Sequence, residues 1–295
     1  MTQEEPTSES ESHTTPQPNN PSTVVTLQLA HTLNETETAV QMSWSDGLKR
    51  QNGNPLGIGI EPFSGAVGFV AKNLEYPSFN RVLGVTAKHT DILEEIVGWY
   101  GRQGIPCQVE IVPHLADKAL LHKLADLGLA QTDFNTVFYA RPPFEPRPLL
   151  TEIELKQYED DDLKLFAQLY VKLFPRLSPS EEEALRQETV ARHSLPGWRC
   201  YLAWVDGKLA GYARMYVRDE TASFSGAFSL HKFRGRGIQQ TLLRRRVLDA
   251  SALRCNLIVS QAAPGTTSQR NMEREGFRVA YHKAIFVVAH NTFNH

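Results

Sequence analysis

The stretch from Phe228 to Leu243 constrains the fold of this chain more than any other part of the sequence. Residues 221–230 are rich in aromatic, β-branched and small residues, which predicts a strand, and residues 238–250 hold good helix formers without Gly or Pro. Gly235 and Gly237 lie between these segments. Glycine lets a backbone approach a ligand closely, and the unpaired N–H groups at a helix start attract anions. With Lys232, Arg234 and Arg236 interleaved, the turn predicts a diphosphate site; a glycine turn with a solvated basic face is the alternative.

Two common phosphate-binding loops do not fit this stretch. A Walker A loop needs the run G-x-x-x-x-G-K-[ST], which the sequence lacks, and a Rossmann fingerprint needs a third glycine where Gln240 stands. The remaining pattern, Arg234-Gly-Arg-Gly-Ile-Gln239, resembles the pyrophosphate loop of the GNAT superfamily of N-acetyltransferases, [Q/R]-x-x-G-x-[G/A]. Arg234 and Gly237 match this loop, whereas Gln239 replaces its last small residue.

A second motif supports the same resemblance. After a predicted strand at residues 255–261, the segment from Ser268 to Phe277 is similar to the family's second cofactor helix, which ends in a Gly-Phe pair. The resemblance covers roughly residues 150–288. It implies an α/β fold with a mixed, mostly antiparallel sheet flanked by helices. It also implies acetyl-CoA as co-substrate and transfer of the acetyl group to an amine of a small molecule or a protein.

The family's functional positions map onto this sequence residue by residue. Phe228 and Leu230 are expected to contact the pantetheine arm through their backbones, like an added strand. The other cofactor-binding residues implied by the resemblance are Arg234, Gly235, Arg236, Gly237, Ile238, Gln239, Ser268 and Asn271.

The catalytic residues are harder to assign. The family often protonates the leaving thiolate with a Tyr four residues before the Gly of Gly-Phe, but Met272 stands there. Tyr281 is the candidate replacement acid and Glu220 the candidate base. The alternative for Tyr281 is a half-buried packing residue, and the alternative for Glu220 is a solvated carboxylate in a turn. Glu188 and His193 are further candidates for the base. A non-catalytic acyl-CoA-binding or regulatory protein is the alternative function.

Charge and composition indicate which partners and which cellular compartment to expect. The net charge of −2 argues against a chain dedicated to nucleic acid, and the consecutive residues Arg244, Arg245 and Arg246 spread over about 200° of a helix. No apolar run approaches the roughly 20 residues of a membrane span. Three widely spaced cysteines predict no metal site and an intracellular, cytoplasmic protein. A homodimer is left open.

The first half predicts a second, related unit. We expect strands at residues 24–29, 57–60, 65–71, 81–85, 108–112 and 135–139, and helices that begin at Asp91 and Lys118. The order of helix, strand, helix, Gly and strand occurs in both halves, but the first lacks an Arg-Gly-x-Gly run. We therefore predict a disordered tail (1–22), a degenerate GNAT-like domain (23–141), a Pro-rich linker (142–149) and a GNAT domain that binds acetyl-CoA (150–290).

Overall fold

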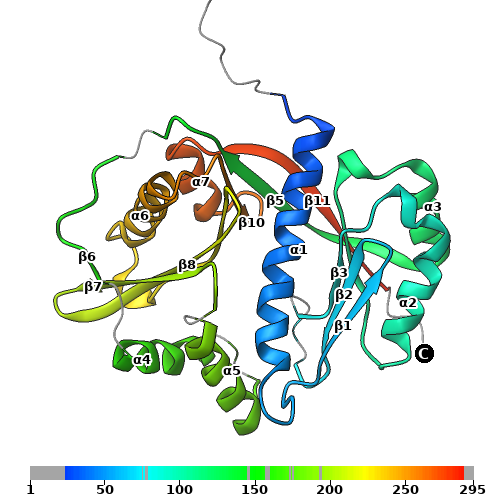
Figure 1. Ribbon diagram of the computed structural model, residues 1–295, viewed down its shortest axis with the longest axis horizontal. Coiled ribbons are helices and arrows are strands. Elements are labelled where there is room, and N and C mark those ends of the chain that lie inside the picture. The colour runs from blue at the N-terminus through cyan, green and yellow to red at the C-terminus, as the bar shows by residue number, and fades with distance from the viewer. Residues whose placement is uncertain are drawn as a thin grey trace, which may run out of the picture.

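The computed structural model describes residues 24–74, 76, 79–144, 147–156, 160–172, 174, 176–192 and 195–288. The predicted tail at residues 1–22 and His193 lie outside them. The described strands form one eleven-stranded mixed sheet with the order β1-β2-β3-β4-β11-β5-β10-β9-β8-β7-β6 (Figure 1). Only β3–β4 and β9–β10 pair in parallel, so the expected mixed, mostly antiparallel sheet is confirmed.

The strands and helices have the following bounds. The strands are β1 (Ile58–Phe63), β2 (Ala66–Ala71), β3 (Arg81–Leu83), β4 (Gln108–Ile111), β5 (Leu129–Ala140), β6 (Glu154–Lys156), β7 (Trp198–Val205), β8 (Lys208–Arg218), β9 (Thr221–Ser229), β10 (Leu257–Ala262) and β11 (Arg278–Val288). The α-helices are α1 (Leu27–Lys49), α2 (Leu93–Gly101), α3 (Lys118–Asp126), α4 (Asp160–Val171), α5 (Pro179–Ala191), α6 (Ile238–Ala252) and α7 (Thr267–Arg274).

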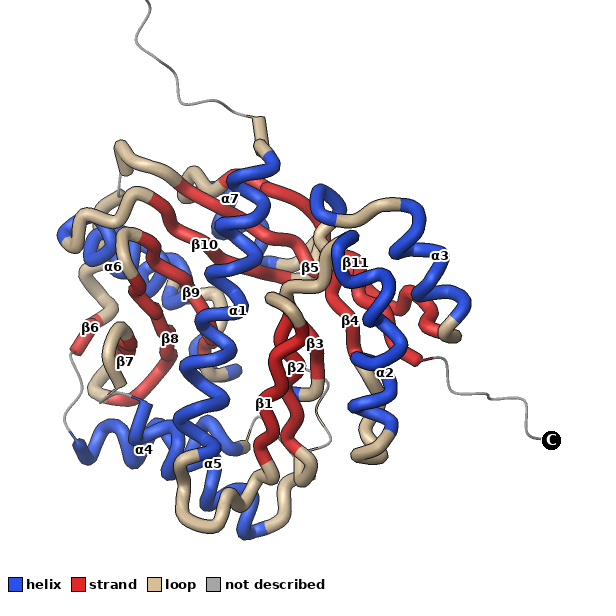
Figure 2. The backbone as a smooth tube through the Cα atoms, turned by 45° about the vertical axis from the view of Figure 1, so that its right-hand side comes forward, coloured by secondary structure: helices blue, strands red, loops and turns tan. Residues whose placement is uncertain are grey.

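The helix α1 corrects one expectation. The predicted strand at residues 24–29 is wrong, because Thr26 caps a long helix and its hydroxyl accepts a hydrogen bond from the Leu29 N–H at 3.1 Å. The buried stripe of this helix contains Asn34, Glu37, Gln41 and Ser45, so its apolar periodicity is weak. Figure 2 shows α1 lying across the sheet, where it contacts β1, β3 and β9.

The helix expected from Asp91 also begins differently. Thr86 and His89 form a capping box for a 3₁₀ helix at Ala87–Ile92, and α2 continues from Leu93. Asp91 therefore does not cap this segment. In α5, Ser178 and Glu181 form a capping box, as the run Ser-Pro-Ser-Glu at residues 178–181 predicts from the sequence.

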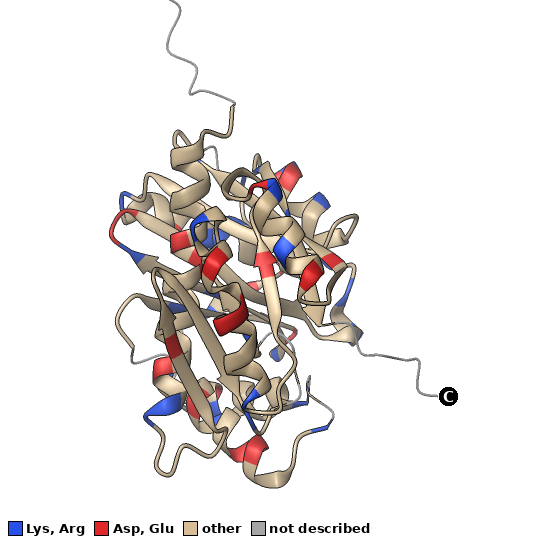
Figure 3. Ribbon diagram, turned by 90° about the vertical axis from the view of Figure 1, so that its right-hand side faces the viewer, with Lys and Arg blue, Asp and Glu red and all other residues tan. Residues whose placement is uncertain are grey.

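The two halves of the chain share the sheet. The strand β11, from the second half, lies between β4 and β5 of the first, so that Ala284 pairs with both Ile111 and Phe134. The division at residues 142–149 stays a prediction. Figure 3 shows that the positions of acidic and basic residues are interspersed along the ribbon in the view that it presents.

The helices cover opposite faces of the sheet around β10. Leu257 and Val259 pack in one cluster with Leu33 of α1, whereas Ile258 packs in another cluster with Leu242 of α6. Because successive side chains of a strand point to opposite faces, α1 lies on one face and α6 on the other. No helix in the described part of the chain has the length and apolarity to span a membrane.

Candidate functional site

The site is built where β9 and β10 part. The two strands pair in parallel from Thr221 and Leu257 as far as Phe224 and Ser260. Beyond these positions β9 pairs with β8 alone and β10 with β5 alone, within the residues that the structure describes. The facing strand edges therefore present backbone N–H and C=O groups to any extended ligand that enters the gap.

A first pocket lies at the mouth of this gap, and we call it the turn pocket. It has a volume of about 560 Å³ and is bounded by the turn after β9 and by the N-termini of α6 and α7. Gly237 is the N-cap of α6 in a left-handed conformation (φ 76°), and no side chain caps this helix. The N–H groups of its first turn are thus available to an anion.

Local geometry explains why this turn needs glycine. Gly235 and Gly237 have φ values of 81° and 76°, which side chains with a Cβ rarely adopt. A Cβ on Gly237 would lie 2.3 Å from Cδ1 of Leu150, whereas a Cβ on Gly235 would meet no atom within 4 Å. The open space above Gly235 leaves room for a phosphate against the main chain.

Most of the predicted cofactor residues line the turn pocket. Two do not: the Leu230 N–H donates to the Ala210 carbonyl at 2.9 Å, and Arg236 pairs with Asp206 at 3.0 Å. The eight that the structure brings together are Phe228, Arg234, Gly235, Gly237, Ile238, Gln239, Ser268 and Asn271.

A second pocket, which we call the through-sheet pocket, reaches from one face of the sheet to the other. Its volume is about 260 Å³, and it shares Gln239, Ser268 and Asn271 with the turn pocket, so the two pockets adjoin. Leu243, Arg246 and Met272 line it on the α6–α7 face. Glu37, Val40, Gln41 and Arg81 line it on the α1 face. A ligand that enters from the turn pocket can therefore meet a second ligand from the α1 face.

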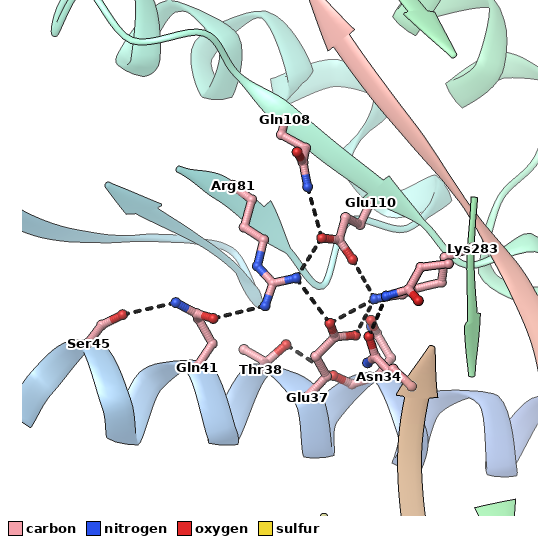
Figure 4. A network of polar contacts seen from close by, with 11 residues as sticks. Asn34, Glu37, Thr38, Gln41, Ser45, Arg81, Gln108, Glu110 and Lys283 are labelled. Carbon is pink, nitrogen blue, oxygen red and sulfur yellow. Dashed lines mark hydrogen bonds and ion pairs between the residues drawn. The ribbon is translucent and has the colours of Figure 1, made fainter. Parts of the chain in front are cut away.

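A buried ionic network fixes the α1 wall of this pocket (Figure 4). The Lys283 ammonium donates to both Glu37 carboxylate oxygens, at 2.7 and 2.6 Å, and also contacts Glu110. Arg81 donates to Glu110 at 2.6 Å and to the Gln41 side chain at 2.9 Å. Burial alone would raise the pKa of Glu110, but the charges of Arg81 and Lys283 hold it well below its usual range. The network holds the Glu37 and Arg81 side chains in place.

Sequence reasoning missed this network because its members come from distant elements. Glu37 and Gln41 lie on α1, Arg81 on β3, Glu110 on β4 and Lys283 on β11. The available signal was the spacing of Glu37 and Gln41, which places both on one helical face.

The predicted catalytic residues, Tyr281 and Glu220, line neither pocket. Tyr281 packs with Leu29 and Leu33 of α1, and burial together with the negative charge of Glu37 raises its pKa well above the usual value. Glu220, in the turn before β9, accepts a hydrogen bond from the Asn256 side chain. Their roles as acid and base stay predictions.

The other catalytic candidates are placed as follows. Met272 lines the through-sheet pocket and has no proton to donate. Glu188 is buried against Arg192 and lines neither pocket. Among the ionisable side chains that line the through-sheet pocket, Glu37 is the single carboxylate in the described part of the chain; the others are Arg81 and Arg246.

The arginine triplet forms no common face. Arg244 pairs with Glu275 at 3.0 Å and Arg245 with Asp249 at 2.9 Å, whereas Arg246 is buried beside Phe224. The described residues contain no group of three or more His, Cys, Asp or Glu side chains placed to hold a metal ion.

Comparisons with known proteins agree with this geometry. The family model described as acetyltransferase (GNAT) family matches residues 163–277, and no curated protein matched the chain. A GCN5-related N-acetyltransferase from Kribbella flavida is similar at 12% identity and a TM-score of 0.59, over 86% of this chain and 96% of that one. A tandem GNAT protein from the clavulanic acid biosynthesis pathway is similar at 14% identity and a TM-score of 0.57, over 87% of this chain and 96% of that one. A GCN5-related N-acetyltransferase from Sphaerobacter thermophilus is similar at 15% identity and a TM-score of 0.57, over 89% of this chain and 93% of that one. These likenesses show the fold.

Proposed function

Starting from the GNAT-family domain at residues 163–277, we propose that the protein transfers an acyl group from a CoA thioester to an amine. Acetyl-CoA is the donor that the family implies, and the acceptor is an amine of a small molecule or a protein. The observation that carries the proposal is the pair of adjoining pockets, the turn pocket and the through-sheet pocket, where β9 and β10 part.

The donor fits this path by its chemistry. The diphosphate suits the uncapped N-terminus of α6 and the Arg234 side chain, both of which attract negative charge. The pantetheine arm carries amide groups that suit the unpaired edges of β9 and β10. The thioester then enters the through-sheet pocket, next to the face on which Glu37 lies.

The reaction follows from the groups around that pocket. The amine nitrogen attacks the thioester carbonyl carbon, the C–S bond breaks, and CoA leaves as a thiolate. Backbone N–H groups on the free edge of β9 can stabilise the oxyanion that forms on the carbonyl oxygen. Glu37, on the opposite side of the gap from Met272, is our proposed acceptor of the amine proton. The thiolate takes its proton from solvent.

Binding of the donor is tested by calorimetry with CoA and acetyl-CoA. Arg234→Ala should weaken binding roughly tenfold to hundredfold, since a hydrogen bond to a charged group contributes about 1.5–3 kcal/mol. Arg236→Ala is the matched control, because Arg236 pairs with Asp206 and does not line the pocket. Absence of binding by the unaltered protein would refute the proposal.

The role of Glu37 is tested by turnover with a panel of amines. Glu37→Gln should lower kcat by roughly 10² to 10⁴, the usual contribution of a general base. Glu35→Gln, on the exposed side of the same helix, is the control. Acetyl-CoA affinity, measured in parallel, separates a loss of chemistry from a loss of folding.

One observation favours a second function. Met272 stands where the family often places its acid, and no Tyr, His, Cys or Lys lines the through-sheet pocket among the described residues. A non-catalytic protein that senses acyl-CoA would have the same binding site. Tight binding of acetyl-CoA without turnover across the amine panel would support this second function.

A further inference from the structure

Arg246 lies at the inner end of the proposed acyl path. Gln239, Leu243 and Arg246 all line the through-sheet pocket and follow one stripe of α6, so Arg246 lies about 10 Å further along the helix than Gln239. Its guanidinium lies 4.5 Å from the ring centre of Phe224, the last β9 residue that pairs with β10. Arg246 is thus placed where the two strands begin to part.

This arginine is buried without a counter-ion. It is 4% exposed, and its Nε and Nη1 groups donate to the backbone carbonyls of Leu242 and Arg214 at 3.2 and 3.0 Å. No carboxylate lies within ion-pair distance of it among the described residues. Its neighbours Arg244 and Arg245 and the buried Arg81 each have one.

Burial makes the absence of a carboxylate partner for Arg246 unfavourable in free energy. It lowers the pKa of the Arg246 guanidinium to about 10, so the group is still charged at neutral pH. A desolvated cation with only neutral acceptors is unfavourable unless an anion joins it. Phe224, Leu243 and Met272 form an apolar part of the pocket lining, and next to such side chains a carboxylate would interact with less screening by water.

Resting on the proposed function, we propose that Arg246 binds a carboxylate at the far end of the acyl group, and that the preferred donor is the CoA thioester of a short dicarboxylic acid. The faces of the sheet favour the acyl group over the acceptor as the source of this carboxylate. Arg246 is on the α6–α7 face, along the path from the turn pocket. On the α1 face, the cation that lines the pocket among the described residues is Arg81, which already pairs with Glu110 at 2.6 Å.

The test compares two donors that differ in one group. Succinyl-CoA and butyryl-CoA have acyl chains of the same length, and only the first ends in a carboxylate. Calorimetry on the full chain should show that succinyl-CoA binds tenfold or more tightly than butyryl-CoA, as expected for one charge-assisted contact. Equal affinities, or tighter binding of butyryl-CoA, would overturn the inference without any variant.

Variants then locate the contact. Arg246→Met should remove the preference while changing the affinity for free CoA by less than about threefold, and Arg246→Lys should keep part of it. Arg245→Met, which disrupts a pair on the helix surface, should leave the preference unchanged. A preference that survives in Arg246→Met would overturn the assignment. So would a dependence on Arg246 for carboxylated acceptors with acetyl-CoA as donor. Absence of binding of free CoA would refute the proposed function itself, whereas binding of CoA without a preference for succinyl-CoA would refute the role of Arg246 alone.

Discussion

Replacing Lys283 with methionine removes the positive charge between Glu37 and Glu110. The Lys283 side chain is 1% exposed, and those of Glu37 and Glu110 are 9% and 2% exposed, so water cannot replace the lost ammonium. Breaking a buried ion pair from one side costs about 3–5 kcal/mol. Arg81 remains in contact with both carboxylates, so we expect the lower end of this range, about 3 kcal/mol.

The assay is urea unfolding followed by tryptophan fluorescence at pH 7. Lys123→Met is the matched control, because Lys123 pairs with Glu94 at 3.4 Å on the surface, where the Glu94 side chain is 76% exposed. Such a pair contributes about 0–1 kcal/mol. If Lys283→Met lowers the free energy of unfolding no more than Lys123→Met does, the network does not stabilise the fold as a buried unit.

The pH dependence gives an independent check. The folded pKa of Glu110 lies below its unfolded value of about 4.3, so its contribution to stability is present above that pH and is lost as pH falls through the folded pKa. Without Lys283 the folded pKa rises, because one of its two cationic partners is gone. The stability difference between the unaltered protein and Lys283→Met should therefore shrink as the pH is lowered below about 4. A constant or growing difference would contradict this reasoning.

Three further predictions follow from single positions. Gly237→Ala should destabilise the protein more than Gly235→Ala. Both positions have positive φ, which costs an alanine about 1–2 kcal/mol, but only the new Cβ at position 237 clashes with Leu150. Equal unfolding midpoints in urea for the two variants would contradict this prediction. The three buried cysteines should not react with Ellman's reagent at pH 8 until the chain unfolds, because burial raises the pKa of Cys107 to about 12 and of Cys200 to about 11. Tyr281→Phe and Glu220→Gln should each leave kcat within about threefold, as neither residue lines a pocket, and a hundredfold loss in either variant would restore the sequence-based assignment.

Local chemistry made part of this molecule predictable. The Gly235–Gly237 turn and the capping box at Ser178 depend on neighbours in sequence, and both appear as expected. The Asp-Gly pair at residues 206–207 favours a hairpin on its own, and β7 and β8 pair across it. Eight of the ten predicted cofactor residues line the turn pocket. Arg236 does not, because Asp206, thirty positions earlier, pairs with its side chain.

Long-range contacts account for what the sequence could not predict. The α1 helix buries Asn34, Glu37 and Gln41 because partners on β3 and β11 satisfy Glu37 and Gln41, so a helix that reads as polar is covered by the sheet. The pocket wall that contains Glu37 exists only because both halves meet there. No spacing within one element indicates such an arrangement.

The position of β11 has a consequence for biosynthesis. Its residues Arg278–Val288 fill the space between β4 and β5, which are made more than a hundred residues earlier. During translation, the facing edges of β4 and β5 therefore stay unpaired until residues 278–288 have left the ribosome. A gene split at the proline-rich segment would therefore give two polypeptides that cannot complete their sheets separately, and co-expression should recover soluble material only when both are present.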